Sequence, residues 1–330
     1  MNYIDEFLKT DEPHCRLSLN EKTALSYAFL QQAADEIFNP DYEPRFTAAY
    51  FSEEKTLAWM DKLSQLPGYQ FLKLYYRPKL HDADKIPEQE GAMLVSNHTT
   101  IYFGDVTPLF LGVYENKRRI LYGLAHHVFK RSDIMKTIMC IPGNRSNALQ
   151  LLKEDKLVLV CPEGILGACK PWKQNNKVLP VEGFSKTGMG YLRVAYESGK
   201  PIIPVANVGA EETALILGDV KPLVDQTIKS IDDLFAIGKQ KWGEGLLEFM
   251  AKVKVVPLLV NLFPLPSKVD AYVGDAIPVR ELLGNNPQLE DYWELNKLVI
   301  ESLQQQIDQH LRKKKTLLQK LSTANSGWGR

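Results

Sequence analysis

The sequence predicts an α/β fold, a mixed and mostly parallel sheet flanked by helices, with helical extensions at both ends. Two observations support this prediction. From about residue 69 to 280, short apolar runs alternate with amphipathic segments, as strands and helices do in such domains. Outside that region, apolar residues recur at the helical period. We therefore expect a helical N-terminal extension (1–66), an α/β domain (67–285) and an amphipathic C-terminal helix with a tail (286–330).

Six apolar runs are the candidate strands of the sheet. Each is short, rich in Val, Ile or Leu, and bounded by turn-forming residues. Two prolines, Pro201 and Pro204, indicate that the fourth run lies at a sheet edge or a strand end, because proline cannot donate to the ladder. The predicted strands are 92–96, 120–124, 157–161, 201–205, 253–256 and 269–273.

Helices fit the segments between and beyond these runs. Pro142-Gly143 forms a turn before the helix predicted at 146–155. Gly199 is a favoured residue just past the end of the helix predicted at 188–198. In the N-terminal extension, Asn39-Pro40 ends one helix, and a second helix starts after Ser52 and ends at Pro67-Gly68. The predicted helices are 21–38, 52–66, 146–155, 188–198 and 287–321.

The charge balance excludes a domain whose main task is to neutralise phosphates. Forty Lys and Arg residues face forty Asp and Glu residues among 330, so the formal net charge is zero. The charges are unevenly placed, because residues 1–60 carry 11 acidic and 5 basic side chains. We expect the remainder to present a basic face to anionic donors and lipid headgroups. Its cations cluster at 117–119, 130–131, 170–177 and 312–315.

The sequence favours a cytoplasmic protein that binds peripherally to a membrane. Four cysteines without a C-x-x-C pair do not form a disulfide framework. Asp5 and Glu6 stand where a signal peptide needs a basic region. No run approaches the roughly 18 apolar residues that a spanning helix requires. A contact with a membrane would therefore be made at its surface.

The segment from Ser96 to Asp105 is the first candidate for chemistry. It places Asn97, His98 and Asp105 at a strand end and in the following loop, where α/β folds commonly carry functional side chains. Histidine can take a proton from a hydroxyl near neutral pH, and a carboxylate can orient its ring. A hydrogen-bonded structural histidine is the alternative at this point.

The second candidate is the end of the next buried run, Cys161-Pro162-Glu163-Gly164. Gly164 permits a sharp turn and a close approach of the backbone to a ligand. The Glu163 carboxylate can accept hydrogen bonds from substrate hydroxyls. An ordinary strand exit is the alternative for this segment alone.

The order of these blocks, with Pro201-Ile202-Ile203-Pro204-Val205 after them, resembles the glycerolipid acyltransferase superfamily, in particular a bacterial glycerol-3-phosphate or 1-acylglycerol-3-phosphate acyltransferase-like branch. The resemblance covers roughly residues 85–280. It implies the α/β fold of glycerol-3-phosphate acyltransferases and O-acyltransferase activity in lipid metabolism. It also implies that His98 is the general base, that Asp105 assists it, and that Asn97, Glu163 and Gly164 contribute to substrate binding.

The chain departs from the pattern of that family at two places. Six residues rather than four separate His98 from Asp105, so the spacing alone does not establish their pairing. Ile165 and Leu166 stand where the family carries an arginine that binds the acceptor's phosphate. Arg145 and Lys170 are the candidate replacements for that cation.

The resemblance implies acyl-CoA or acyl carrier protein as donor, a lipid hydroxyl as acceptor, and no metal, cofactor or nucleic acid. Two alternatives stay open: a lipid-binding relative without activity, and an esterase or thioesterase. Other classes match poorly, because 183–187 lacks the second glycine of a hydrolase elbow and the glycines of a P-loop. The adjacent His126-His127 pair is a poor metal site, and Lys313 to Lys315 is a short cluster without aromatic residues.

Overall fold

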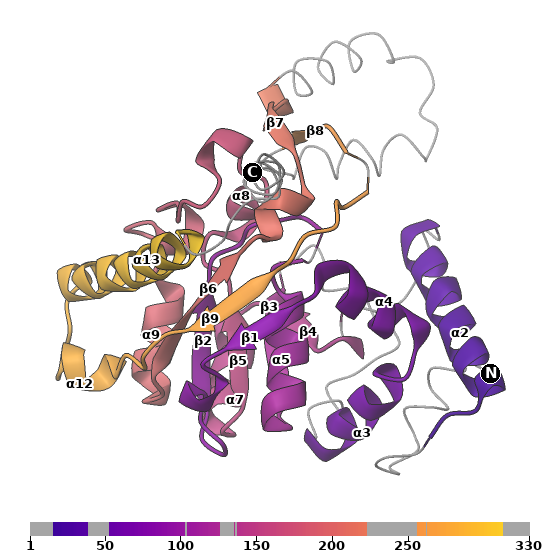
Figure 1. Cartoon of the computed structure of the whole chain (residues 1–330). Coiled ribbons are helices and arrows are strands. Elements are labelled where there is room, and N and C mark those ends of the chain that lie inside the picture. Colours follow the sequence, from indigo (N-terminus) through magenta and orange to yellow (C-terminus); the bar gives the residue numbers. More distant parts are fainter. Residues whose placement is uncertain are drawn as a thin grey trace, which may run out of the picture.

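A seven-stranded sheet forms the centre of the computed structural model, which describes residues 16–38, 53–102, 104–125, 135, 137–222, 256–261 and 263–312 (Figure 1). The strand order is β1-β9-β6-β2-β5-β3-β4. The strands of this sheet are β1 (Lys79–His81), β2 (Ala92–Ser96), β3 (Leu121–Ala125), β4 (Cys140–Pro142), β5 (Leu157–Val160), β6 (Ile202–Val208) and β9 (Asp270–Val273). A separate two-stranded sheet pairs β7 (Ile216–Asp219) with β8 (Pro257–Leu259).

Helices surround the sheet and extend away from one side of it (Figure 1). Their bounds are α2 (Leu19–Phe38), α3 (Glu53–Leu63), α4 (Pro67–Tyr76), α5 (Thr107–Lys117), α7 (Arg145–Lys153), α8 (Gly164–Ala168), α9 (Gly190–Ser198), α12 (Val279–Leu283) and α13 (Leu289–Leu311). Helices α2, α3 and α4 gather beside the main body, whereas α9, α12 and α13 lie on its other side.

The sheet is mixed and mostly parallel, which confirms the predicted fold class. Five strands run in one direction: β6, β2, β5, β3 and β4. Strand β9 is antiparallel to β6, and β1 is parallel to β9. Parallel strands end at the same edge of a sheet, so the segments that follow β2, β5 and β6 meet there. This edge carries the candidate residues 97–105 and 161–164.

Both faces of the sheet are covered, which explains the continuous apolar runs of its strands. In β2, Ala92 and Leu94 point into the cluster that includes Leu109 and Val113 of α5. Met93 and Val95 point into the opposite cluster, to which α7, α9 and α13 contribute. Along α13, a buried stripe faces the sheet at helical spacing: Leu295, Val299, Leu303 and Ile307. The tail helix therefore packs as part of the core.

Two proline predictions are wrong. Pro67 begins α4, because proline fits the first helical turn, where its missing N–H is not needed. Pro204 lies in β6, an interior strand bonded to β2 and β9. The strand tolerates it because the β6–β9 pairing starts at the next residue, Val205, opposite Val273. The Pro204 carbonyl still accepts a hydrogen bond from the backbone N–H of Gly274 at 2.8 Å.

Several predicted segments lie partly or wholly outside the described residues. These are residues 1–15, the helix boundaries at Asn39-Pro40 and Ser52, most of the strand at 253–256, and the tail beyond residue 312. Strands β1, β4, β7 and β8 and helices α4, α5, α8 and α12 were not expected. None of the described helices combines the length and the apolar character needed to cross a bilayer.

Candidate functional site

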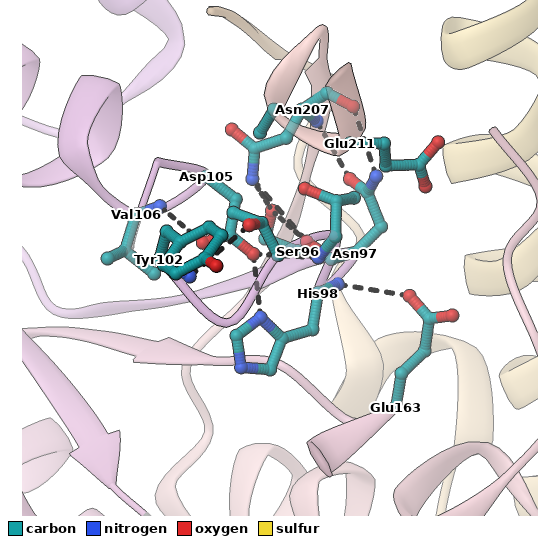
Figure 2. Close-up of polar contacts among 12 residues, drawn as sticks. Ser96, Asn97, His98, Tyr102, Asp105, Val106, Glu163, Asn207 and Glu211 are labelled. Carbon is teal, nitrogen blue, oxygen red and sulfur yellow. Dashed lines mark hydrogen bonds and ion pairs between the residues drawn. The ribbon is translucent and has the colours of Figure 1, made fainter. Parts of the chain in front are cut away.

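The structure brings His98 and Asp105 into direct contact at the end of β2. The Nδ1 atom of His98 lies 2.6 Å from Oδ2 of Asp105 (Figure 2). The six-residue separation is thus compatible with pairing, because the loop turns back before α5 begins. Asp105 is completely buried, while 24% of the His98 side chain remains exposed.

The Asp105 carboxylate accepts three hydrogen bonds, which fix the orientation of the imidazole. Oδ2 also accepts the backbone N–H of Thr99 at 2.7 Å, and Oδ1 accepts that of Val106 at 2.9 Å. An ionised carboxylate only accepts, so the proton of a neutral His98 lies on Nδ1. Nε2 then carries the free lone pair and can act as a base.

Charge and burial shift the pKa of His98 in opposite directions, and the same is true of Asp105. Burial lowers the pKa of His98, but the Asp105 charge and hydrogen bond raise it, and the result lies above the usual value. Burial raises the pKa of Asp105, but His98 and the two backbone donors lower it below its usual value. Asp105 therefore remains ionised and stabilises an imidazolium on His98.

Asn97 fixes the backbone immediately before His98 instead of lining a substrate site. Its side-chain Oδ1 accepts the Asn207 N–H at 2.7 Å, and its Nδ2 donates to the Asn207 carbonyl at 3.0 Å (Figure 2). These bonds continue the pairing of β2 with β6 by one residue. Asn97 is 1% exposed, so the prediction that it binds substrate is corrected to an internal clamp.

Glu163 lies behind His98 and is also completely buried. Its Oε2 accepts the backbone N–H of His98 at 3.0 Å, and its Oε1 accepts that of Leu179 at 2.9 Å (Figure 2). The prediction that Glu163 shapes an acceptor pocket is therefore corrected. Its carboxylate bonds to the backbone of the segment that carries His98.

Gly164 has the geometry that the turn after β5 requires. Its φ is +58°, and an added Cβ would lie 1.8 Å from Oε2 of Glu182. Only glycine fits such a position without strain. Gly164 also lines the cavity that contains His98.

The His98 cavity is small and otherwise mostly apolar. Its volume is about 140 Å³, and Phe110, Leu159, Cys161 and Ile165 are among its walls. A second apolar hollow of about 330 Å³ lies between α3, α4, α5 and β3. The two spaces share the lining residues Val106, Phe110 and Cys140, so they adjoin.

The structure places neither predicted phosphate ligand at the cavity. Arg145 begins α7, is 66% exposed and pairs with Glu197 of α9, in a hollow that shares no lining residue with the His98 cavity. Lys170 is 2% exposed and lies between Glu163 and Glu211. Both predictions are wrong, because sequence gives the charge of a side chain but not its buried partner.

The cations at 117–119 do not form the expected basic face either. Lys117 pairs with Glu88, and Arg118 pairs with Asp61 at 2.8 Å. Arg119 is largely buried and donates to the carbonyls of three residues, Pro87, Glu90 and Asp155. The clusters at 130–131 and 313–315, and the pair His126-His127, lie outside the described residues.

Two further residues of the site were missed. Asn207, near the end of β6, forms the hydrogen bonds to Asn97, and Glu211, in the turn after β6, binds Lys170. Their polar side chains at the end of β6 were the available signal. Within the described part of the chain, no three His, Cys, Asp or Glu side chains are arranged to hold a metal ion.

Comparison with known proteins shows which family the sheet-forming part of the chain resembles. Residues 77–208 match the sequence profile of the family described as Acyltransferase. An uncharacterized protein of Mycobacterium leprae is 27% identical over 163 residues, which are 46% of this chain and 42% of that protein. Uncharacterized proteins of Mycobacterium bovis and Mycobacterium tuberculosis are 26% identical over 219 residues, 63% of this chain and 54% of theirs. The chain thus spans about half the length of these curated relatives.

A solved structure, that of the 1-acyl-sn-glycerophosphate acyltransferase PlsC from Thermotoga maritima, aligns with a TM-score of 0.46 and 14% sequence identity. The alignment covers 78% of this chain and 83% of that one. The family match contains His98, Asp105 and Glu163, together with strands β2, β5 and most of the sheet. Residues 77–208 of the chain are thus similar to the family described as Acyltransferase.

Proposed function

We propose that this protein transfers a fatty acyl group from acyl-CoA or acyl carrier protein to a hydroxyl of a glycerolipid or lysophospholipid. The observation that carries the proposal is the 2.6 Å contact between His98 and Asp105 beside an apolar cavity. A lipid-binding relative without activity would not need this pair. Neither would it need the fixed Nδ1 tautomer, which leaves Nε2 free for a proton.

In the proposed reaction, Nε2 of His98 removes the proton of the acceptor hydroxyl as its oxygen attacks the thioester carbonyl. The carbon–sulfur bond then breaks, and the thiolate takes the proton back from Nε2. Asp105 stabilises the imidazolium between these two steps. No acyl-enzyme forms. The products are the acylated acceptor and the free thiol, and His98 returns to its neutral state.

His98→Ala should abolish acyl transfer, because general-base catalysis contributes about 10² to 10⁴-fold to such reactions. The assay follows thiol release and acylated product with a panel of lipid alcohols. His81→Ala is a matched control, since His81 pairs with Asp270 at 2.9 Å outside the cavity. Transfer that persists in His98→Ala would exclude this mechanism. Thioester cleavage without any acylated acceptor would instead favour the thioesterase alternative.

The activity should fall as the pH drops through the His98 titration, whose pKa is raised, because only neutral imidazole accepts a proton. Asp105→Asn removes the charge that raises this pKa, so the acidic limb should shift to lower pH. The plateau should also drop by about tenfold or more, because the tautomer is no longer fixed. Rate against pH measures both effects. An unchanged limb would contradict the assigned pair, and the exposed Asp275, changed to Asn, serves as control.

We propose that the hollow between α3, α4 and α5 holds the acyl chain. It adjoins the His98 cavity, and its walls include Met60, Leu63, Leu111 and Met139. Leu72 lines it while remaining 38% exposed, so a larger residue there can be tolerated by the fold. An aliphatic chain that leaves the thioester carbonyl would bury its methylenes in this space.

Leu72→Trp should lower kcat/KM for a sixteen-carbon acyl donor by about tenfold, because the indole fills space that several methylenes would occupy. Transfer of a butyryl group should change little, since so short a chain ends near His98. Kinetics with both donors give the ratio. Leu282→Trp is the matched control, because Leu282 is 58% exposed on α12 and lines neither cavity. An equal loss for both donors would place the acyl chain elsewhere.

We propose that the protein works at a membrane surface, where its lipid acceptor resides. Support comes from exposed apolar side chains around the site: Phe71 (57%) and Leu74 (77%) on α4, and Phe263 (80%) in the segment after β8. That segment is tied to α4 by the Tyr75 hydroxyl, which donates to the Pro264 carbonyl at 2.5 Å. It is also tied to the loop after His98 by Tyr102, which donates to the Asn261 carbonyl at 2.6 Å.

The double variant Leu74→Ser/Phe263→Ser should reduce partitioning onto liposomes by about tenfold or more, because each side chain loses apolar area that the interface would bury. Sedimentation with liposomes measures the partition coefficient. Leu282→Ser is the control, since Leu282 is 58% exposed on α12 and remote from this patch. Equal partitioning of the double variant and the wild type would refute this surface.

A further inference from the structure

Lys170 is a buried cation whose two ion-pair partners are buried as well. Its Nζ lies 3.1 Å from Oε1 of Glu211 and 3.4 Å from Oε1 of Glu163, and it donates to the Lys177 carbonyl at 2.8 Å. The side chains of Lys170, Glu163 and Glu211 are 2%, 0% and 6% exposed. An ion cluster of this kind is costly to bury, so its position in the fold needs a physical explanation.

The cluster joins the two strands that flank β2. Glu163 follows β5, Glu211 lies in the 3₁₀ turn that follows β6 (Ala210–Thr213), and the sheet order places β2 between those strands. Lys170 follows α8 and bridges the two carboxylates behind the β2 end. The cluster therefore fixes the neighbours on both sides of the strand that delivers His98.

Glu163 holds both of its backbone partners most strongly as an ion. Oε2 accepts the His98 N–H and Oε1 accepts the Leu179 N–H, and a proton on either oxygen would make that oxygen a donor and weaken it as an acceptor. Burial raises the pKa of Glu163, and the charge of Lys170 is the foremost influence that opposes the rise. Burial likewise raises the pKa of Glu211, against the Lys170 charge and hydrogen bond.

We propose that Lys170 is a positioning residue, whose ammonium, held by Glu211, keeps the Glu163 carboxylate ionised and aimed at the backbone N–H of His98. Lys170 lines neither the His98 cavity nor the adjoining hollow. Its charge influences the pKa of His98 less than Asp105 and Glu163 do, so its main route to His98 is through Glu163. The proposal rests on the proposed function for its kinetic readout. The charged and titratable groups that face Glu163 are Lys170, His98 and, across Lys170, Glu211.

The primary test compares Lys170→Met with Lys173→Met, the same change at an exposed lysine of the same loop. Lys170→Met should lower kcat at least tenfold with less than a threefold change in the donor KM, and Lys173→Met should change neither. In Lys170→Met, Glu163 must lose a proton to accept both backbone N–H groups as a carboxylate, so the ratio of the variant kcat to the wild-type kcat should rise with pH. The Tm of Lys170→Met should fall as pH rises, because ionising a buried carboxyl whose pKa is raised in the folded state destabilises the fold.

A ratio of Lys170→Met kcat to wild-type kcat that rises with pH, while the Tm of Lys170→Met falls relative to wild type, therefore supports the proposal. A purely structural role predicts that kcat and Tm decline together, and that result would overturn it. The route through Glu163 is tested with the charge-balanced variant Glu163→Gln/Lys170→Met, which also serves if Lys170→Met fails to fold. Its kcat should lie within threefold of Glu163→Gln alone, and a further tenfold loss would show that Lys170 acts independently of Glu163.

The outcome is separable from that of the proposed function. If wild type and His98→Ala both lack transfer activity, the proposed function fails. The ionisation of Glu163 is then tested by Tm alone, which should fall with rising pH in Lys170→Met but not in Lys173→Met. If wild type is active and Lys170→Met equals Lys173→Met, only the role of Lys170 fails.

Discussion

The buried carboxylate of Asp105 is the constraint on which the site depends. A charge with no exposed surface must be compensated, and here the His98 imidazole and two backbone N–H groups provide the compensation. These bonds close the loop from His98 to Asp105 and set the imidazole tautomer in one arrangement. Other residues of the site fix the backbone of His98, so that its imidazole lies within reach of Asp105. The Asn97 clamp fixes the residue before it, and Glu163 holds its backbone from behind.

The site has a charged side and an apolar side, and His98 lies between them. Asp105, Glu163, Lys170 and Glu211 are all buried. Asp105 binds the imidazole and two backbone N–H groups, whereas Lys170 binds both Glu163 and Glu211. The cavity in front is lined by residues such as Phe110, Leu159 and Ile165. This division suits a reaction that moves one proton beside a long apolar chain. Charged groups orient the base, while the apolar walls leave room for methylenes and exclude water from them.

Periodicity predicted most of the fold because local patterns reflect burial. The runs at 92–96 and 157–161 correspond to β2 and β5, and the tail pattern corresponds to the buried stripe of α13. The short strands β1 and β4 were missed, since three residues carry too little pattern to be recognised. Proline was misjudged at Pro67 and Pro204 because its effect depends on which backbone groups need a partner, and that is decided by neighbours distant in sequence.

The sequence by itself determined the α/β class, the order of the motifs, and His98 and Asp105 as the candidate pair. Local residue types suffice for these, because strand, turn and glycine preferences act over a few residues. Only the tertiary structure decided the roles of the other polar residues. It turned Asn97 and Glu163 inward, left Arg145 on the surface, and buried Lys170 beside a glutamate 41 positions away. A sequence specifies a charge, but the partner of that charge depends on which strand ends the sheet brings together.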